Sequence, residues 1–125
     1  LPIYFPVSDF ISVGFLSSPA QKFNITVNCD TTVQPELKIT SANGYDTAFE
    51  GVIKLTQQTG MATGVGVRML FDDHLATFGT YVSTQNQAVA NETLVIPFEV
   101  RYEQVSNVVT PGPANTVATI TLAYK

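Results

Sequence analysis

The end of the chain, residues 112–125, carries the pattern that most limits what this protein can fold into. Small polar side chains, such as Thr119 and Thr121, alternate there with apolar ones. The apolar positions are Ala118, Ile120, Leu122 and Tyr124. This period of two predicts a β-strand with one face in a core and one face outward. A strand this apolar is normally followed or flanked by a partner, and we expect that this sequence supplies none after it.

Five further segments show strand patterns separated by turn residues. The clearest is 22–30, whose apolar face is formed by Phe23, Ile25, Val27 and Cys29. The others are 37–40, 51–56, 64–71 and 91–104. Segment 75–86 is expected to be a loop or a short strand. If it is counted, there are roughly seven strands and no helix, which is typical of an immunoglobulin-like sandwich. A length of 125 residues suits one domain, so we predict a single all-β domain spanning 1–125.

Prolines and turn residues add local expectations. Segment 1–6 is apolar and contains two prolines, which predicts an edge strand that begins abruptly, and 7–18 is expected to switch sheets or form an ordered loop. Pro97 inside 91–104 predicts an edge strand or a bulge. The pair Asn43-Gly44 and the run 72–74 are predicted turns.

Composition excludes several classes of function. The net charge is −4 and only 13% of residues are charged, without a basic stripe, which argues against a nucleic acid or an anionic membrane as partner. No apolar run approaches the ~20 residues that a membrane-spanning helix needs. The hydrophobic fraction of 45% is that of a globular chain.

Candidate catalytic and metal-binding groups are few. Cys29 and His74 are the only cysteine and the only histidine, and they lie far apart without a triad context. A small buried hydrophobe is therefore the preferred interpretation of Cys29. Asp72, Asp73 and His74 fit a solvated turn better than a metal site. The glycines of 60–66 lack the Gly-Lys-Ser/Thr ending of a phosphate-binding loop. We expect no enzyme activity, cofactor or metal.

A family resemblance adds to this interpretation. Gly112, fourteen residues from the end, the alternating strand and the penultimate Tyr124 resemble the C-terminal motif of chaperone–usher pilus subunits. The resemblance implies an incomplete immunoglobulin-like sandwich that lacks its final strand and is completed by a donor strand. It also implies a site for donor strand and chaperone formed by Gly112, Ala118, Ile120, Leu122, Tyr124 and Lys125. The Lys125 carboxylate would be anchored by basic residues of the chaperone.

Two internal segments are similar to the same family. Segment 23–29 resembles the second strand of pilins, in which a cysteine closes a disulfide to the first strand. The resemblance implies such a role for Cys29, with a partner outside this chain. The sequence contains no second cysteine, which departs from the pattern. Either the chain is truncated within the first strand, the alternative we favour, or the disulfide is absent from this subunit.

The stretch 51–70 is similar to the pilin domain of a fimbrial tip adhesin. The resemblance implies a structural subunit held by a periplasmic chaperone, passed to an outer-membrane usher and linked to a neighbouring subunit on the bacterial surface. An upstream lectin domain in the same polypeptide would accompany the tip-adhesin role. A shaft or adaptor subunit is the alternative within the family, and a stand-alone carbohydrate-binding sandwich is the alternative outside it. The absence of tryptophan argues against the last.

Overall fold

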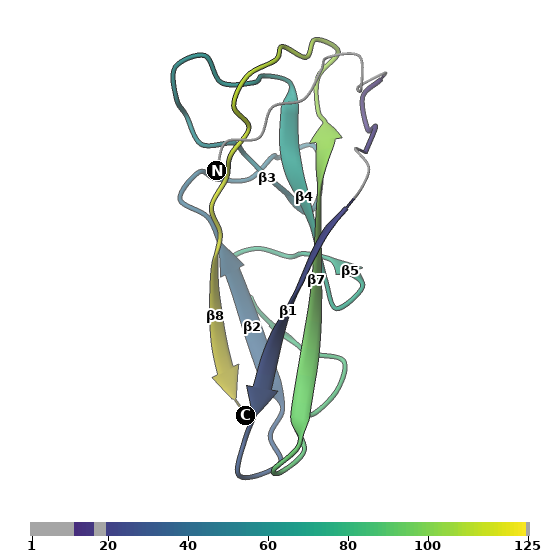
Figure 1. The fold of residues 1–125 in the computed structure, drawn as a ribbon, viewed down its shortest axis with the longest axis vertical. Helices are drawn as coiled ribbons and strands as arrows, with labels where there is room; N and C mark the ends of the chain where they lie inside the picture. Colours follow the sequence, from purple (N-terminus) through teal and green to yellow (C-terminus); the bar gives the residue numbers. More distant parts are fainter. Residues whose placement is uncertain (1–11, 17–19, 125) are drawn as a thin grey trace.

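The computed structural model describes residues 12–16 and 20–124 and shows eight β-strands in that part of the chain (Figure 1). In chain order they are β1 (Gln21–Asn28), β2 (Pro35–Thr40), β3 (Val52–Ile53), β4 (Val65–Phe71), β5 (His74–Leu75), β6 (Tyr81–Ser83), β7 (Thr93–Gln104) and β8 (Thr119–Tyr124). Every pairing between them is antiparallel, and the described residues contain no helix. The predicted all-β class is confirmed.

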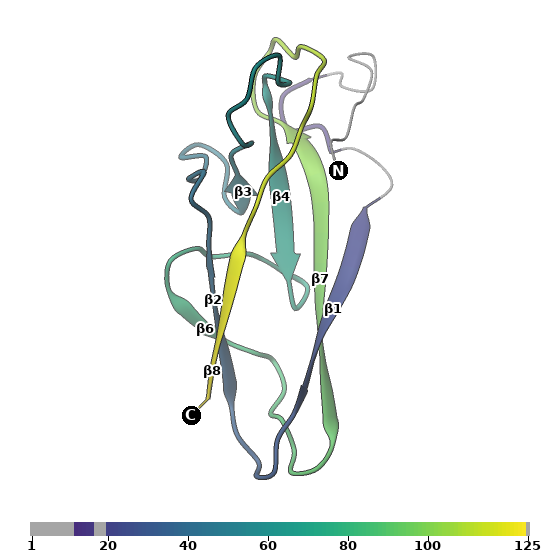
Figure 2. The ribbon, with the colours of Figure 1, turned by 60° about the vertical axis from the view of Figure 1, so that its left-hand side comes forward.

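The strands form two sheets that face each other. One sheet has the order β1-β7-β4-β3, with β5 beside β4, and the other has the order β6-β2-β8. Figure 2 shows β2 and β8 in one layer and β1, β7 and β4 in the other. The chain crosses between the sheets several times, at β1–β2, β2–β3, β5–β6, β6–β7 and β7–β8, as expected for a sandwich of immunoglobulin type. This arrangement leaves β1 and β8 at the edges of different sheets.

The core lies between the two sheets and is formed by the predicted apolar faces. Leu37 and Ile39 of β2 are 1% and 2% exposed, and Ile96 and Phe98 of β7 are equally buried. Within each pair the two residues are one residue apart, because the side chains of a strand alternate between its two faces. The longest strand, β7, thus contributes one whole face to the core, as its sequence predicts.

The segment predicted as a strand at 51–56 pairs over two residues only. β3 ends at Ile53, and the next backbone groups find partners elsewhere: the Lys54 N–H donates to the Gly44 carbonyl and the Thr56 N–H to the Asn115 carbonyl. The alternating pattern predicts a strand over the whole of 51–56, but the observed strand covers only Val52–Ile53. The predicted length of this strand was therefore wrong. Segment 1–6 and most of 7–18 lie outside the described residues.

Pro97 lies in a central strand, which corrects the expectation of an edge or a bulge. Its strand β7 is paired with β1 on one side and with β4 on the other. The Pro97 carbonyl accepts from the Asp72 N–H, so the ring nitrogen also faces the β4 side, just beyond the last residue of β4. Because β4 has already ended there, proline removes no ladder hydrogen bond.

The predicted turn at 72–74 is confirmed. Asp72 and Asp73 have φ of 54° and 68°, and His74 pairs with Phe71 at the start of β5. Two successive positive φ values are those of the tight turn that matches the twist of a hairpin. The Asp72 carboxylate accepts from the Gln85 N–H at 2.6 Å, which gives this acidic side chain a structural role.

Candidate strand-acceptor site

The last strand, β8, is an edge strand. It pairs with β2 along its whole length, with Leu122 opposite Leu37 and Ile120 opposite Ile39. Backbone groups of an antiparallel strand point alternately to its two sides, so half of those of β8 point away from β2. Among the described residues no segment pairs with that outer side. An unpaired edge of this kind is a template for an added strand.

The apolar face of β8 is only partly covered. Ala118, Ile120 and Leu122 pack against the main core but are half-buried. The partners of Leu122 and Ile120 on β2 are fully buried. Tyr124 is 51% exposed. The strand therefore has the composition of a core strand without the burial of one.

The facing edge strand, β1, shows the same incomplete burial. Ile25 and Cys29 are half-buried, and Phe23 is 42% exposed although its ring stacks on Phe98 at 4.9 Å. Only Val27 of this apolar face is fully buried. We define the acceptor strip as the inward-facing, partly exposed side chains of the two edge strands and of one residue beside each: Phe23 and Ile25 of β1 with Cys29 just after it, and Ile120, Leu122 and Tyr124 of β8 with Ala118 just before it.

The two halves of the acceptor strip meet at one end. The Cys29 thiol lies near enough to the Tyr124 hydroxyl to affect its ionisation. Partial burial, and then the Cys29 thiol, raise the pKa of the Tyr124 hydroxyl above its usual value. Cys29 is a free thiol in the described residues. This proximity places the C-terminal ends of β1 and β8 at the same end of the strip.

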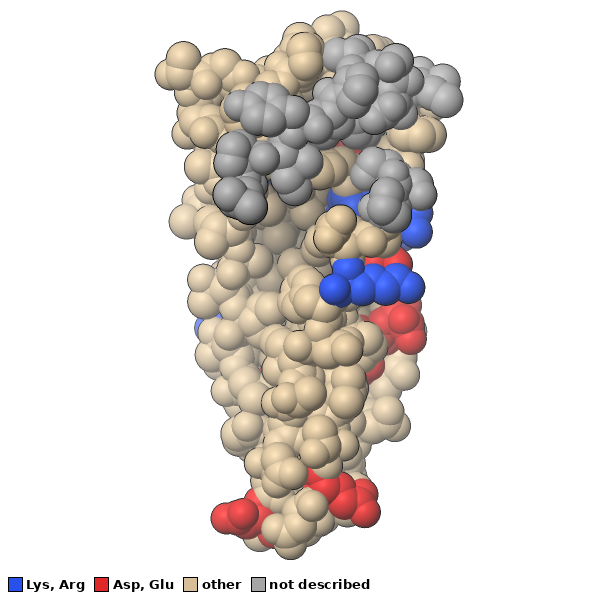
Figure 3. All heavy atoms as spheres, viewed as in Figure 1, with Lys and Arg blue, Asp and Glu red and all other residues tan. Residues whose placement is uncertain are grey.

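The surface around the acceptor strip carries few charged groups. Figure 3 shows a largely tan surface over the left and middle of this face, with a blue group at its left edge and red groups at its lower end. Lys22 of β1 is directed to the outer face of its sheet, where it pairs with Glu99 at 4.0 Å. An apolar, uncharged strip flanked by open backbone edges suits an extended segment with alternating apolar side chains.

Gly112 lies apart from the other residues of the predicted site. It is in the loop before β8 and has φ of 149°, and a Cβ there would meet the Gly60 carbonyl oxygen at 2.1 Å. The Ala62 N–H donates to the Pro113 carbonyl in the same contact. Gly112 thus allows the loop to lie directly on the backbone of 60–62 and to direct the chain into β8. Lys125 lies outside the described residues.

Replacing Gly112 by Ala is expected to destabilise the domain by about 2–4 kcal/mol. The new Cβ would collide with backbone atoms, and φ lies in a region that side chains rarely adopt, so overpacking and backbone strain add. Gly79→Ala is the matched control, because Gly79 has φ of 80° but no atom within 4 Å of its Cβ. Urea denaturation of both variants measures the difference. Equal stability of the two would show that the loop adapts to Gly112→Ala.

Sequence reasoning named only the β8 half of the acceptor strip, together with Cys29. The contribution of Phe23 and Ile25 depends on β1 being an edge strand, which its alternation does not reveal. The signal that could have suggested them is their place on the same apolar face as Cys29.

The described residues thus define a class of protein: a sandwich of two sheets in which two edge strands, each open on its outer side, border a half-buried apolar strip. The family model described as fimbrial protein matches residues 3–125, and the chain belongs to the fimbrial protein family. Among solved structures it is similar to a Burkholderia pseudomallei protein described as an antigen and type I fimbria protein, with a TM-score of 0.72 and 25% identity over 94% of this chain and 75% of that one. A search of curated protein sequences gives no match.

Two features are absent from the described residues. No helix there is long and apolar enough to cross a membrane. No group of three or more His, Cys, Asp or Glu side chains in that part of the chain is placed to hold a metal ion. Membership of the fimbrial family makes the chain a structural subunit of a surface fimbria, which assembles with other pilus subunits.

Proposed function

We propose that this subunit is assembled by the chaperone–usher pathway and that its acceptor strip receives a donated strand. The observation that carries the proposal is the matched half-burial along the two edge strands, which extends over Ile25 of β1 and the adjoining Cys29, and over Ile120 and Leu122 of β8. An inserted strand would pair with the open edge of β8 and cover the apolar side chains of both sheets. The role is structural, and no enzyme activity is part of it.

Two partners would occupy the strip in turn. In the periplasm a chaperone strand would pair with β8 while basic chaperone residues hold the carboxylate of Lys125. At the outer-membrane usher a neighbouring subunit would replace it with its own donor strand, and the finished fimbrium would stand on the cell surface. The apolar side chains of the strip on β8, Ile120 and Leu122, support an apolar donor.

Within this pathway we propose the pilin domain that anchors a tip adhesin, with a lectin domain upstream in the same polypeptide. The support is the similarity of 51–70 to such domains in sequence. A shaft or adaptor subunit is the second candidate. The residues that precede Leu1 in the gene product decide between them: a lectin domain supports the first, and a short alternating apolar extension supports the second.

The experiment that tests the acceptor strip is site-specific cross-linking. A photoreactive residue at Thr121, on the outward face of β8, is the control and should give no cross-link to the donor strand. Because this side chain points away from the core, the change does not disturb the apolar face. A stronger test places the photoreactive residue at Phe23, which is 42% exposed at the opposite border of the strip. Cross-linking from Phe23 to the donor strand is expected, and its absence in an assembled fimbria would contradict the proposal.

Cys29 is expected to be oxidised in the full-length subunit. It would pair with an upstream cysteine on the first strand, because the periplasm is oxidising. Closing a loop of some tens of residues would stabilise the fold by roughly 3–4 kcal/mol according to chain entropy. Mass spectrometry of the intact subunit with and without reductant measures the increase in mass from the two hydrogens that a disulfide gains on reduction. A free thiol in the native subunit would exclude the disulfide and leave Cys29 as the neighbour of Tyr124.

A further inference from the structure

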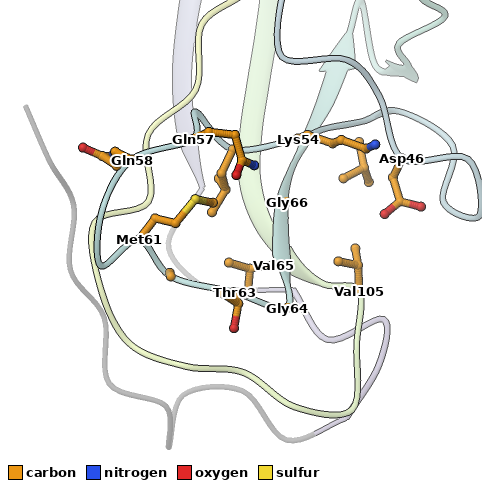
Figure 4. Close-up of a pocket in the computed structure, with 13 residues that line it drawn as sticks. Asp46, Lys54, Gln57, Gln58, Met61, Thr63, Gly64, Val65, Gly66 and Val105 are labelled. Atoms are coloured by element: carbon orange, nitrogen blue, oxygen red, sulfur yellow. The ribbon is translucent and has the colours of Figure 1, made fainter.

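A second open edge lies beside the first residues of β4, and it borders a cavity of about 440 Å³ (Figure 4). Figure 4 shows Asp46 and Lys54 on one side of the cavity, Gln57 on the other and Gly66 on the strand between them. The lining contains no aromatic side chain. This cavity is formed by residues other than those of the acceptor strip.

The cavity exists because β3 is shorter than the strand it accompanies. The β3–β4 register ends at the pair Ile53 and Val67. Beyond it the chain turns away from β4, since the Lys54 N–H donates to the Gly44 carbonyl at 3.0 Å. The first residues of β4 are therefore left without a strand on this side, although β7 continues to pair with them on the other.

Val65 directs its backbone groups into this opening. The Gly64 carbonyl accepts from the Val105 N–H and so faces β7, while the Met69 N–H donates to Gly51 on the opposite side. Because successive residues of a strand alternate, the N–H and C=O of Val65 point to the same side as those of Met69. No backbone hydrogen bond to Val65 on that side is present among the described residues.

These two groups are costly to leave unpaired. Val65 is only 6% exposed, and buried backbone donors and acceptors almost always have partners. In an antiparallel ladder two opposite residues exchange two hydrogen bonds, each through its own N–H and C=O. The N–H and C=O of Val65 could form such a pair with one residue of an extended peptide. A cavity of 440 Å³ is within the range of ~300–1,000 Å³ typical of ligand sites.

We propose that this cavity binds a short extended peptide segment of another protein chain, which pairs with Val65 as an added strand beside β4. The amide of Gln57 and the charged groups of Asp46 and Lys54 border the cavity and favour a segment with polar side chains. The site would give the subunit a lateral protein contact in addition to the donated strand. It does not depend on the chaperone–usher proposal, because it shares no residue with the acceptor strip.

Amide hydrogen exchange of the full-length subunit, followed by NMR, tests the pairing state of Val65. In the free protein the Val65 N–H is expected to exchange at least about tenfold faster than that of Met69, which is bonded to Gly51. The probe is the capped tetrapeptide acetyl-Thr-Val-Thr-Val-amide. At ten times its dissociation constant it should slow Val65 exchange about tenfold.

Two variants separate the cavity from the rest of the surface. Gln57→Trp should fill the cavity and abolish the peptide effect on Val65, and the exposed side chain makes the change compatible with folding. Gln87→Trp is the matched control at an exposed glutamine outside the cavity. Slow exchange of Val65 in the free protein would overturn the proposal, as would equal protection of Val65 by the peptide in the Gln57→Trp variant. Protection of Leu122 without Val65 would mean that the peptide acts only as a donor strand, and would also overturn it.

Discussion

Deleting Tyr124 and Lys125 is expected to abolish capture of the subunit by its chaperone. The deletion removes the carboxylate that would be anchored in the chaperone cleft and shortens the paired edge of β8. Tyr124 is 51% exposed, so its loss leaves the fully buried core intact. Co-purification of the tagged chaperone with the truncated chain measures capture. Normal capture would show that β8 is an ordinary core strand and would remove the main support of the proposed function.

Substitutions within β8 give the same test at single positions. Ile120→Asp or Leu122→Asp places a carboxylate against Ile39 or Leu37 and in the path of the donor strand, and both should abolish capture. Thr119→Ser is the matched control, because Thr119 is exposed on the outward face and should leave capture nearly unchanged. A one-residue shift of the strand would have the same effect as the Asp variants, since it turns every apolar side chain outward.

A donor peptide is expected to raise the stability of the isolated chain greatly. A donor of about ten residues would bury about five apolar side chains, which at ~1.5–3 kcal/mol each amounts to roughly 8–15 kcal/mol before entropic costs. This is comparable with the net stability of a whole domain, ~5–15 kcal/mol. Without a donor the chain should therefore be unstable or aggregate through its acceptor strip and the open edge of β8.

Thermal unfolding with and without donor peptide measures this effect. The matched control is a peptide of the same composition whose apolar residues are moved by one position, which presents its polar side chains to Ile25 and Ile120. A rise in melting temperature with the first peptide and none with the second is the expected result. A high melting temperature for the free chain that no peptide changes would contradict the missing-strand interpretation.

The fold class and most strands follow from the sequence alone. Alternation identified β1, β2, β4, β7 and β8, and it assigned the faces of β7 correctly, because a period of two directly reports which side of a strand meets the core. The turn at Asp72 and Asp73 was equally predictable from residue type. The length of the strand at 51–56 was predicted wrongly because an alternating segment forms a strand only where a neighbouring strand can pair with it. Here the Lys54 N–H donates to the Gly44 carbonyl instead of pairing with β4.

Sequence by itself determined that β8 is a half-apolar strand and that Cys29 shares the apolar face of β1. Only the tertiary structure decided that both strands lie at edges of different sheets, that Phe23 and Ile25 border the same strip, and that the Cys29 thiol lies near the Tyr124 hydroxyl. The physical reason is that alternation reports the two faces of a strand and carries no information about its two edges. Which edge stays unpaired depends on contacts between residues far apart in the chain, and so does the open edge at Val65.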